Sequence, residues 1–165
     1  MSDSATTSRT GRETAYREAI ARILLLIEDE PDWIAAMATA ACELHHSFDH
    51  FDWTGFYRAD EQGNLVIGPY QGGHGCLRIR NGRGVCGAAA ATLQTQLVPD
   101  VEEFPGHISC SDSTRSEIVV PVLRLSGKIL AVLDVDSDTP NAFGEEDRAA
   151  LEELCQELSV RYGGE

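Results

Sequence analysis

The first third of the chain carries apolar residues at helical spacing. Between Glu13 and Glu28 they recur every three or four positions, which is the period of one face of an α-helix. A second stripe follows an acidic break and runs from Trp33 to Phe48. Residues 1–12 show no such period and are rich in Ser, Thr, Arg and Gly. The pattern therefore predicts two helices behind a disordered tail at residues 1–12.

After residue 50 the apolar period changes from that of a helix to that of a β-strand. Residues 51–59 and 65–70 read as two strands, and Gly63 and Asn64 between them indicate a hairpin turn. Alternate residues of a strand point to the same face. On the first of these strands the residues that share one face are Trp53, Gly55 and Tyr57.

Between this hairpin and residue 116 the pattern is irregular. The glycine-rich stretch 71–84 predicts a loop, and residues 85–93 favour a short helix. A brief strand over residues 95–99 is followed by a long loop at residues 100–115. Loops of that length in compact domains are commonly functional or disordered.

The last third of the chain has the clearest strand and helix patterns. Residues 117–125 and 127–137 are apolar on both faces, which is typical of central strands covered on both sides. We expect them to pair as a hairpin about Ser126. An amphipathic helix follows over residues 141–162. Helices packed on an antiparallel sheet make an α+β fold, and we expect a single domain over residues 13–162.

Charge and composition argue against several classes of protein. The chain has 165 residues, enough for one domain with a proper core. Its 27 acidic and 13 basic residues give a formal charge of −14, which argues against nucleic acid and anionic membranes as partners, because both attract basic surfaces. The N-terminus has no apolar signal region, and apolar runs such as residues 23–27 are too short to span a bilayer. We therefore expect a cytoplasmic protein.

Three carboxylates are placed to meet at one end of the predicted sheet. Asp134 and Asp136 share a strand face with Leu130 and Val132. If the last two strands pair as a hairpin, Glu117 lies near the end where these two acids emerge. Like charges held close raise at least one pKa and create a proton donor near neutral pH. For Asp136 alone, a strand that has already emerged into solvent is an equally good explanation.

The five cysteines fall into two groups. Cys42 and Cys155 lie inside predicted helices, where packing is the favoured role. Cys76, Cys86 and Cys110 lie on loops or at element ends. An odd number of cysteines in a reducing compartment does not indicate a structural disulfide framework. Cys86 stands near the start of a helix, a position that can lower the pKa of a thiol.

Metal binding and hydrolysis are weaker explanations of the loop cysteines than redox chemistry. Their spacings of ten and twenty-four residues do not match a zinc site, and adding His74 and His107 permits a cluster only on paper. His107 beside Cys110 could suggest a thiol hydrolase, but such a pair is defined in space rather than by sequence distance. In redox chemistry, a thiolate becomes a sulfenic acid, and a second thiol condenses with it to a disulfide.

Six motifs together resemble one known family. The chain contains FDWTGFY, LVIGPYQG, GRGVCG, TQLVPDVEEFPGHISC, SEIVVPV and AVLDVDS in this order, together with all three loop cysteines. In this it is similar to the free methionine-(R)-sulfoxide reductases, which are stand-alone GAF-domain enzymes. The resemblance implies a GAF fold, with a six-stranded antiparallel sheet, helices on one face and a loop-covered pocket on the other. It also implies a homodimer.

The resemblance assigns roles to the loop cysteines. It implies that Cys110 attacks the sulfur of free methionine-(R)-sulfoxide and becomes a sulfenic acid, that Cys76 resolves it as a disulfide, and that Cys86 assists in resolution or recycling. Thioredoxin, fed by NADPH through its reductase, would restore the dithiol as an external reductant. The resemblance implies no bound cofactor and no metal.

The resemblance also assigns substrate contacts. Trp53 and Tyr57 match the family's aromatic wall for the S-methyl group, although core packing explains both residues without the resemblance. Glu117, Asp134 and Asp136 match its substrate-binding carboxylates. We favour Asp136 for the sulfoxide oxygen and the other two for the ammonium group. The alternatives are a non-catalytic GAF module that senses a small ligand or redox state, and a metal-bound structural protein.

Overall fold

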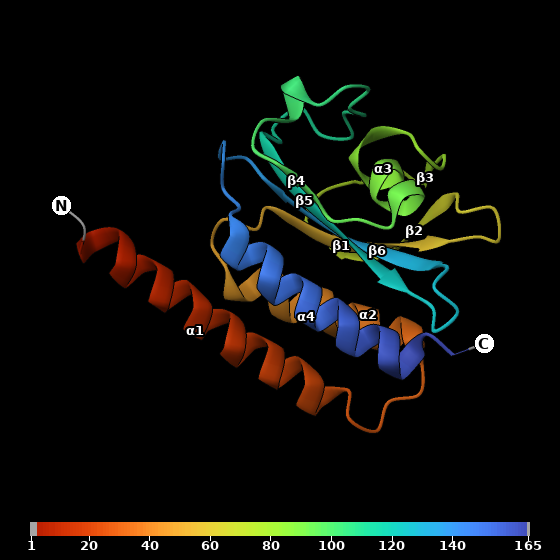
Figure 1. Ribbon diagram of the computed structural model, residues 1–165, viewed down its shortest axis with the longest axis horizontal. Helices are drawn as coiled ribbons and strands as arrows, with labels where there is room; N and C mark the ends of the chain where they lie inside the picture. The colour runs from red at the N-terminus through yellow and green to blue at the C-terminus, as the bar shows by residue number, and fades with distance from the viewer. Residues whose placement is uncertain (1–2, 165) are drawn as a thin grey trace.

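A six-stranded antiparallel sheet forms the centre of the molecule (Figure 1). The computed structural model describes residues 3–164, with side chains from residue 11 onward. The strand order is β3-β2-β1-β6-β5-β4, which confirms the predicted antiparallel sheet. The strands are β1 (Trp53–Ala59), β2 (Leu65–Gln71), β3 (Arg78–Ile79), β4 (Gln96–Val98), β5 (Ser116–Leu123) and β6 (Ile129–Ser137).

The helices cover the two faces of the sheet unequally. α1 (Asp3–Leu26), α2 (Trp33–Ser47) and α4 (Glu145–Tyr162) lie on one side, whereas α3 (Gly84–Thr92) and long loops lie over the other (Figure 1). One of these loops, between β4 and β5, contains the 3₁₀ turn η1 (Val101–Glu103). Within residues 3–164 no helix has the length and hydrophobicity needed to cross a bilayer.

Alternation along β5 divides the core in two. Ile118, Val120 and Val122 are buried with residues of α1, α2 and α4, while Val119 is buried with residues of α3 on the opposite face. Successive side chains of a strand point to opposite faces, and both sets are apolar because both faces are covered. The prediction of central strands covered on both sides is confirmed.

Helix α1 begins earlier than the hydrophobic pattern predicts. It starts at Asp3, so the predicted disordered tail is wrong for residues 3–12, while residues 1 and 2 lie outside the described part of the chain. The first turns of α1 project past the other elements (Figure 1), where a helix needs no apolar stripe. Arg12 anchors the helix, because it donates to the Ala142 carbonyl oxygen at 3.3 Å and to Asp147 Oδ2 at 3.1 Å.

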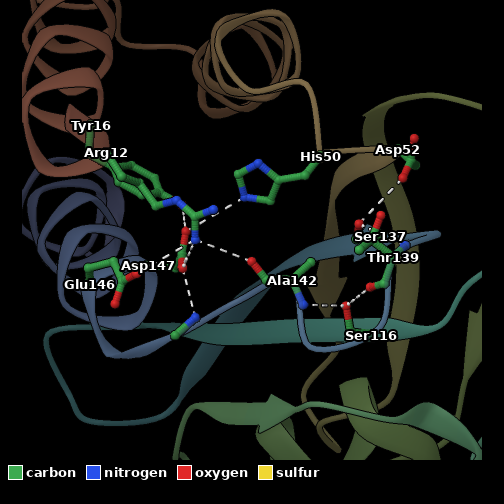
Figure 2. Close-up of polar contacts among 11 residues, drawn as sticks. Arg12, Tyr16, His50, Asp52, Ser116, Ser137, Thr139, Ala142, Glu146 and Asp147 are labelled. Atoms are coloured by element: carbon green, nitrogen blue, oxygen red, sulfur yellow. Dashed lines mark hydrogen bonds and ion pairs between the residues drawn. The ribbon is translucent and has the colours of Figure 1, made fainter. Parts of the chain in front are cut away.

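Asp147 joins α4 to α1 from a fully buried position (Figure 2). Its carboxylate accepts hydrogen bonds from the Tyr16 hydroxyl at 2.6 Å, the Gly144 N–H at 2.7 Å and Arg12 at 3.1 Å, and His50 Nε2 lies 3.8 Å away. Burial by itself would raise the pKa of Asp147. The close contact with His50, the hydrogen bonds from Tyr16 and Gly144 and the charge of Arg12 outweigh burial and lower that pKa. The native form of Asp147 is therefore the ionised carboxylate.

Replacing Asp147 with Asn should destabilise the fold by about 3 kcal/mol, because the buried partners lose the charge that they surround. A carboxyl whose pKa is lowered by folding contributes stability above its ordinary pKa, and this contribution is lost as the pH falls through the folded-state pKa. The stability difference between wild type and Asp147→Asn should therefore shrink in acid. Urea unfolding at pH 7 and at acidic pH measures this stability difference. Asp49→Asn, at an exposed position, is the control. Equal stability of Asp147→Asn and Asp49→Asn at pH 7 would contradict the prediction.

Candidate active site

The three predicted carboxylates converge on the face of the sheet that α3 and the loops cover. In the strand register Glu117 lies opposite Asp136, and Asp134 lies opposite Gly55. Glu117 and Asp134 are only 6% and 4% exposed. The Oδ1 atom of Asp136 is also buried, so the strand has not emerged into solvent at this residue. The predicted convergence of three acids is confirmed.

Burial controls the protonation of this carboxyl cluster. It raises the pKa of Glu117, Asp134 and Asp136 well above ordinary carboxyl values, and nearby negative charges raise each pKa further. Both effects favour the protonated forms of the cluster. Oδ1 of Asp134 and Oδ1 of Asp136 are buried with no hydrogen-bond partner among the described residues. A buried oxygen without a partner is costly, and these two atoms are suited to receive a polar ligand.

Asp52, the residue before β1, holds the backbone around Asp136. The Asp52 N–H donates to the Asp136 carbonyl oxygen at 2.9 Å. The Asp52 carboxylate accepts from the Ser137 hydroxyl at 3.5 Å (Figure 2). It also accepts from the Asp138 N–H at 2.7 Å. The chain is thus fixed on both sides of Asp136, and the direction of its side chain is fixed with it.

Cys86 belongs to the carboxyl cluster. Its Sγ lies 3.8 Å from Glu117 Oε1, and the side chain is buried. Burial, followed by the charges of Asp134 and Glu117, raises the pKa of this thiol well above its ordinary value. The expectation of a lowered pKa is therefore wrong, because burial beside carboxyl groups outweighs the dipole of α3 at its first turn. Cys86 is a neutral thiol that donates to Glu117.

A disulfide joins Cys76 to Cys110, and their Cα atoms lie 5.5 Å apart. Cys76 precedes β3, and Cys110 lies in the loop between η1 and β5. Two loops therefore bring together sulfurs that are 34 residues apart in the sequence. Cys86 is not part of this bond. The pairing is the one that the family resemblance implies.

The two helical cysteines differ in burial. Cys155 is buried in α4, as its predicted packing role requires, and burial raises its pKa. Cys42 is exposed, so the prediction that it packs in the core is wrong. Its position lies outside the apolar stripe of α2, and helical geometry outweighs the general tendency of cysteine to be buried. The buried residues of α2 are Ala36, Met37, Ala40, Ala41 and Leu44.

The Cys110 side of the disulfide lines a cavity of about 40 Å³ above the carboxyl cluster. Trp53 and Tyr57 of β1 line it too, with ring centroids 5.9 Å apart. Tyr70 stacks on Trp53 at 5.2 Å, and Trp53 Nε1 donates to the Gly73 carbonyl oxygen at 3.0 Å. The two predicted aromatic residues therefore form a cavity wall, and hydrogen bonding ties that wall to the glycine-rich loop.

His107 and Arg83 also line this cavity, and the sequence pattern did not single them out as substrate-site residues. His107 Nε2 lies 3.8 Å from Glu117 Oε2. Burial lowers the pKa of His107, so its ring is neutral at physiological pH. Considered from the sequence only as a partner for Cys110 or as a metal ligand, His107 instead faces an acid. The only sequence signal for either residue is its place in the motifs PGHISC and GRGVCG.

Cys86, Glu117 and Asp134 each offer one atom within 4.8 Å of the others, a separation that a shared cation could bridge. A cation needs deprotonated ligands, whereas burial raises the pKa of all three groups. Without a cation, the three groups therefore favour their protonated forms. Within residues 3–164, His74 and His107 are not members of such a group.

Comparisons with known proteins agree with this architecture. The family model of the GAF domain matches residues 28–160. Protein YtsP of Bacillus subtilis is 44% identical over 89% of this chain and 90% of that protein. The free methionine-R-sulfoxide reductase of Saccharomyces cerevisiae is 39% identical over 79% of this chain and 76% of that protein. The X-ray structure of the Neisseria meningitidis free methionine-R-sulfoxide reductase in complex with its substrate has a TM-score of 0.85 and 44% identity, over 89% of this chain and 87% of that chain.

The curled antiparallel sheet, its helices and the matching family model define a GAF-domain protein. Relatives at 39% to 44% identity over most of the chain identify one family within this class. The chain belongs to the free methionine-R-sulfoxide reductase family. The resemblance drawn from the six sequence motifs is confirmed at this level.

Proposed function

We propose that this protein reduces free L-methionine-(R)-sulfoxide to methionine, as an oxidoreductase acting on sulfur. The observation that carries the proposal is the Cys76–Cys110 disulfide beside a cavity lined by buried carboxyl groups. Sulfoxide reduction consumes two thiols and needs a proton donor, and this site supplies both. The relatives named free methionine-R-sulfoxide reductase in Saccharomyces cerevisiae and Escherichia coli support the choice of substrate.

The first chemical step joins Cys110 to the substrate. Its thiolate attacks the sulfoxide sulfur while the oxygen takes a proton from Asp136. Methionine leaves, and Cys110 becomes a sulfenic acid. One thiolate, one sulfoxide and one proton give one sulfenic acid and one sulfide, so two electrons pass from the cysteine sulfur to the substrate. The Cys76 thiol then displaces water from the sulfenic acid and forms the disulfide.

The remaining groups of the cavity would hold the substrate. Glu117 and Asp134 would bind the ammonium group, whose positive charge favours their ionised forms and leaves the proton on Asp136. Trp53 and Tyr57 would contact the S-methyl group, because sulfur and methyl groups pack favourably on aromatic rings. Backbone N–H groups between Cys110 and Ser116 would hold the substrate carboxylate. A substrate bound at both its ammonium and its carboxylate is a free amino acid.

Recycling requires an external reductant. Thioredoxin, reduced by NADPH through its reductase, would return Cys76 and Cys110 to thiols. Cys86 would assist through its contact with Glu117. No bound cofactor is needed, because the electrons come from thiols. We further propose that the protein acts as a homodimer in the cytoplasm.

The experiment that tests this function is turnover of free L-methionine-(R)-sulfoxide by the full-length protein with thioredoxin, thioredoxin reductase and NADPH. We expect one methionine for each NADPH oxidised, and turnover at least about 100-fold slower on the same residue inside a peptide, since the peptide bonds block both polar anchors. Binding of the sulfoxide with no methionine formed would contradict the proposal. That result would favour the alternative, a GAF module that senses a ligand or a redox state.

A further inference from the structure

His107 is a basic residue in contact with the carboxyl cluster. Its Nε2 lies 3.8 Å from Glu117 Oε2, and the two side chains are only 17% and 8% exposed. Within the described part of the chain, no other basic side chain lies within 4.0 Å of a carboxylate oxygen of Glu117, Asp134 or Asp136. A sheltered base is therefore placed beside one acid of the site, and the steps proposed for sulfoxide reduction give it no role.

A turn in the loop that carries Cys110 fixes the position of His107. The His107 N–H donates to the Phe104 carbonyl oxygen at 3.1 Å, and Gly106 between them has a φ of +74°, which glycine adopts without strain. Phe104 packs against the part of the core under α3. His107 and Cys110 line the same cavity. A displacement of His107 toward Glu117 would therefore also move the loop that carries Cys110.

Burial favours the uncharged forms of both partners. It raises the pKa of Glu117 and lowers the pKa of His107. Ionising either group alone would place an unpaired charge in a buried site, which is costly. The separation of 3.8 Å is also longer than a hydrogen bond. The two side chains are thus neighbours that a change of charge could join more tightly.

A bound ammonium group would supply that change of charge. Held by Glu117 and Asp134, it favours the ionised forms of both carboxyl groups. Two carboxylates and one ammonium leave one negative charge without a partner, and a buried charge needs one. A protonated His107 beside Glu117 cancels this charge. Arg83 lines the cavity too, but its side chain is exposed, so water weakens its effect on the cluster.

The other groups around the cavity are less suited to take the proton of Glu117. Besides His107 and Glu117, the titratable and charged residues that line it are Tyr57 on β1, His74 before β3, Arg83 and Cys86 at the start of α3, Cys110, and Asp134 and Asp136 on β6. Burial raises the pKa of Tyr57 and of Cys86, so both stay protonated. His74 is exposed and, among the described residues, makes no ion pair. A Cys110 thiolate, formed once the disulfide is reduced, would favour a protonated His107 as well.

We propose that His107 is a positioning residue that accepts the proton of Glu117 when the ammonium group of the substrate binds. This inference rests on the proposed binding of that group by Glu117 and Asp134. The O–H bond at Glu117 Oε2 breaks and an N–H bond forms at His107 Nε2, with no change in the number of electrons or protons of the pair. The imidazolium then donates to the Glu117 carboxylate at about 2.8 Å, which draws the Cys110 loop toward the substrate. The proton returns to Glu117 when methionine leaves.

The test follows the protonation of His107 by NMR in the full-length Cys110→Ser protein with isotope-labelled histidine. This variant cannot turn the substrate over, and it has no thiolate at position 110. Comparison with Cys110→Ser/His107→Gln assigns the His107 signal among those of the five histidines. Saturating free L-methionine-(R)-sulfoxide at pH 7 should move the ring shifts of His107 from those of a neutral imidazole to those of an imidazolium. Calorimetry should show that His107→Gln weakens binding of the sulfoxide by about 10-fold.

Two controls separate proton transfer from other effects of the ligand. In Glu117→Gln, which has no proton to transfer, His107 should stay neutral at a sulfoxide concentration that calorimetry shows to be saturating. The signals of His46, exposed on α2 across the sheet, should not move in either protein. A neutral His107 at saturating sulfoxide, or an imidazolium in both Cys110→Ser and Cys110→Ser/Glu117→Gln, would overturn the proposal. Because no reduction takes place, a failure of the proposed function would appear only in the turnover assay.

Discussion

Replacing Cys110 with Ser should lower turnover of free methionine sulfoxide by a factor on the order of 10⁴ or more. A serine hydroxyl is a far weaker nucleophile than a thiolate at neutral pH, and it cannot form the bond to Cys76 that the structure contains. The fold should be little affected, because residue 110 is exposed and Ser has nearly the same shape as Cys. The NADPH-coupled assay measures the loss, and thermal unfolding checks the fold.

Three further cysteine variants locate this effect. Cys42→Ser and Cys155→Ala should keep the wild-type rate, because neither residue belongs to the disulfide or to the cavity lining. Cys76→Ser should form one methionine per chain and then turn over slowly, because the sulfenic acid lacks its resolving thiol. If Cys42→Ser were as inactive as Cys110→Ser, the assignment of chemistry to the loop thiols would be wrong.

Replacing Asp136 with Asn should lower kcat by about 10²–10⁴-fold with little change in KM, because the amide keeps the shape of the side chain but cannot supply the proton. Burial raises the pKa of Asp136 well above the ordinary value of a carboxyl, and this favours the protonated form that donates. A group that acts as an acid works only below its own pKa. The kcat of the wild-type protein should therefore fall as the pH rises through that pKa.

The pH profile distinguishes proton donation from a structural role. In Asp136→Asn the alkaline fall of kcat that belongs to this carboxyl should disappear, whereas a merely structural role would leave the shape of the profile unchanged. Asp138→Asn serves as the control, because Asp138 is exposed and lies two residues away on the same chain. A loss of kcat of equal size in Asp138→Asn would argue against donation by Asp136.

The central sheet and the carboxyl cluster could be predicted from the sequence because short-range patterns decide both. A period of two along residues 127–137 places Asp134 and Asp136 on one face. Pairing with the preceding strand as a hairpin brings Glu117 opposite Asp136. Such arguments need only neighbouring strands. Cys155 could be placed correctly for a similar reason, because the helical period of α4 puts it inside the apolar stripe.

The errors occur where long-range contacts override local preference. The first turns of α1 carry no apolar stripe. The helix is anchored just after them by Arg12, whose partner Asp147 is distant in sequence. Cys86 has the helix position that lowers a thiol pKa, but residues of β5 and β6 surround it and raise that pKa. His107 meets Glu117 only after its loop folds over the sheet. No pattern within one segment carries this information.

The most direct measurement of the central claim is a single turnover without a reductant. The fully reduced protein is mixed with one equivalent of free L-methionine-(R)-sulfoxide, quenched with acid, alkylated and mapped by mass spectrometry. We expect one methionine per chain, the loss of two hydrogen atoms from the protein mass, and a cross-linked peptide pair that contains Cys76 and Cys110. Formation of methionine with both of these residues still alkylated as free thiols would contradict the mechanism.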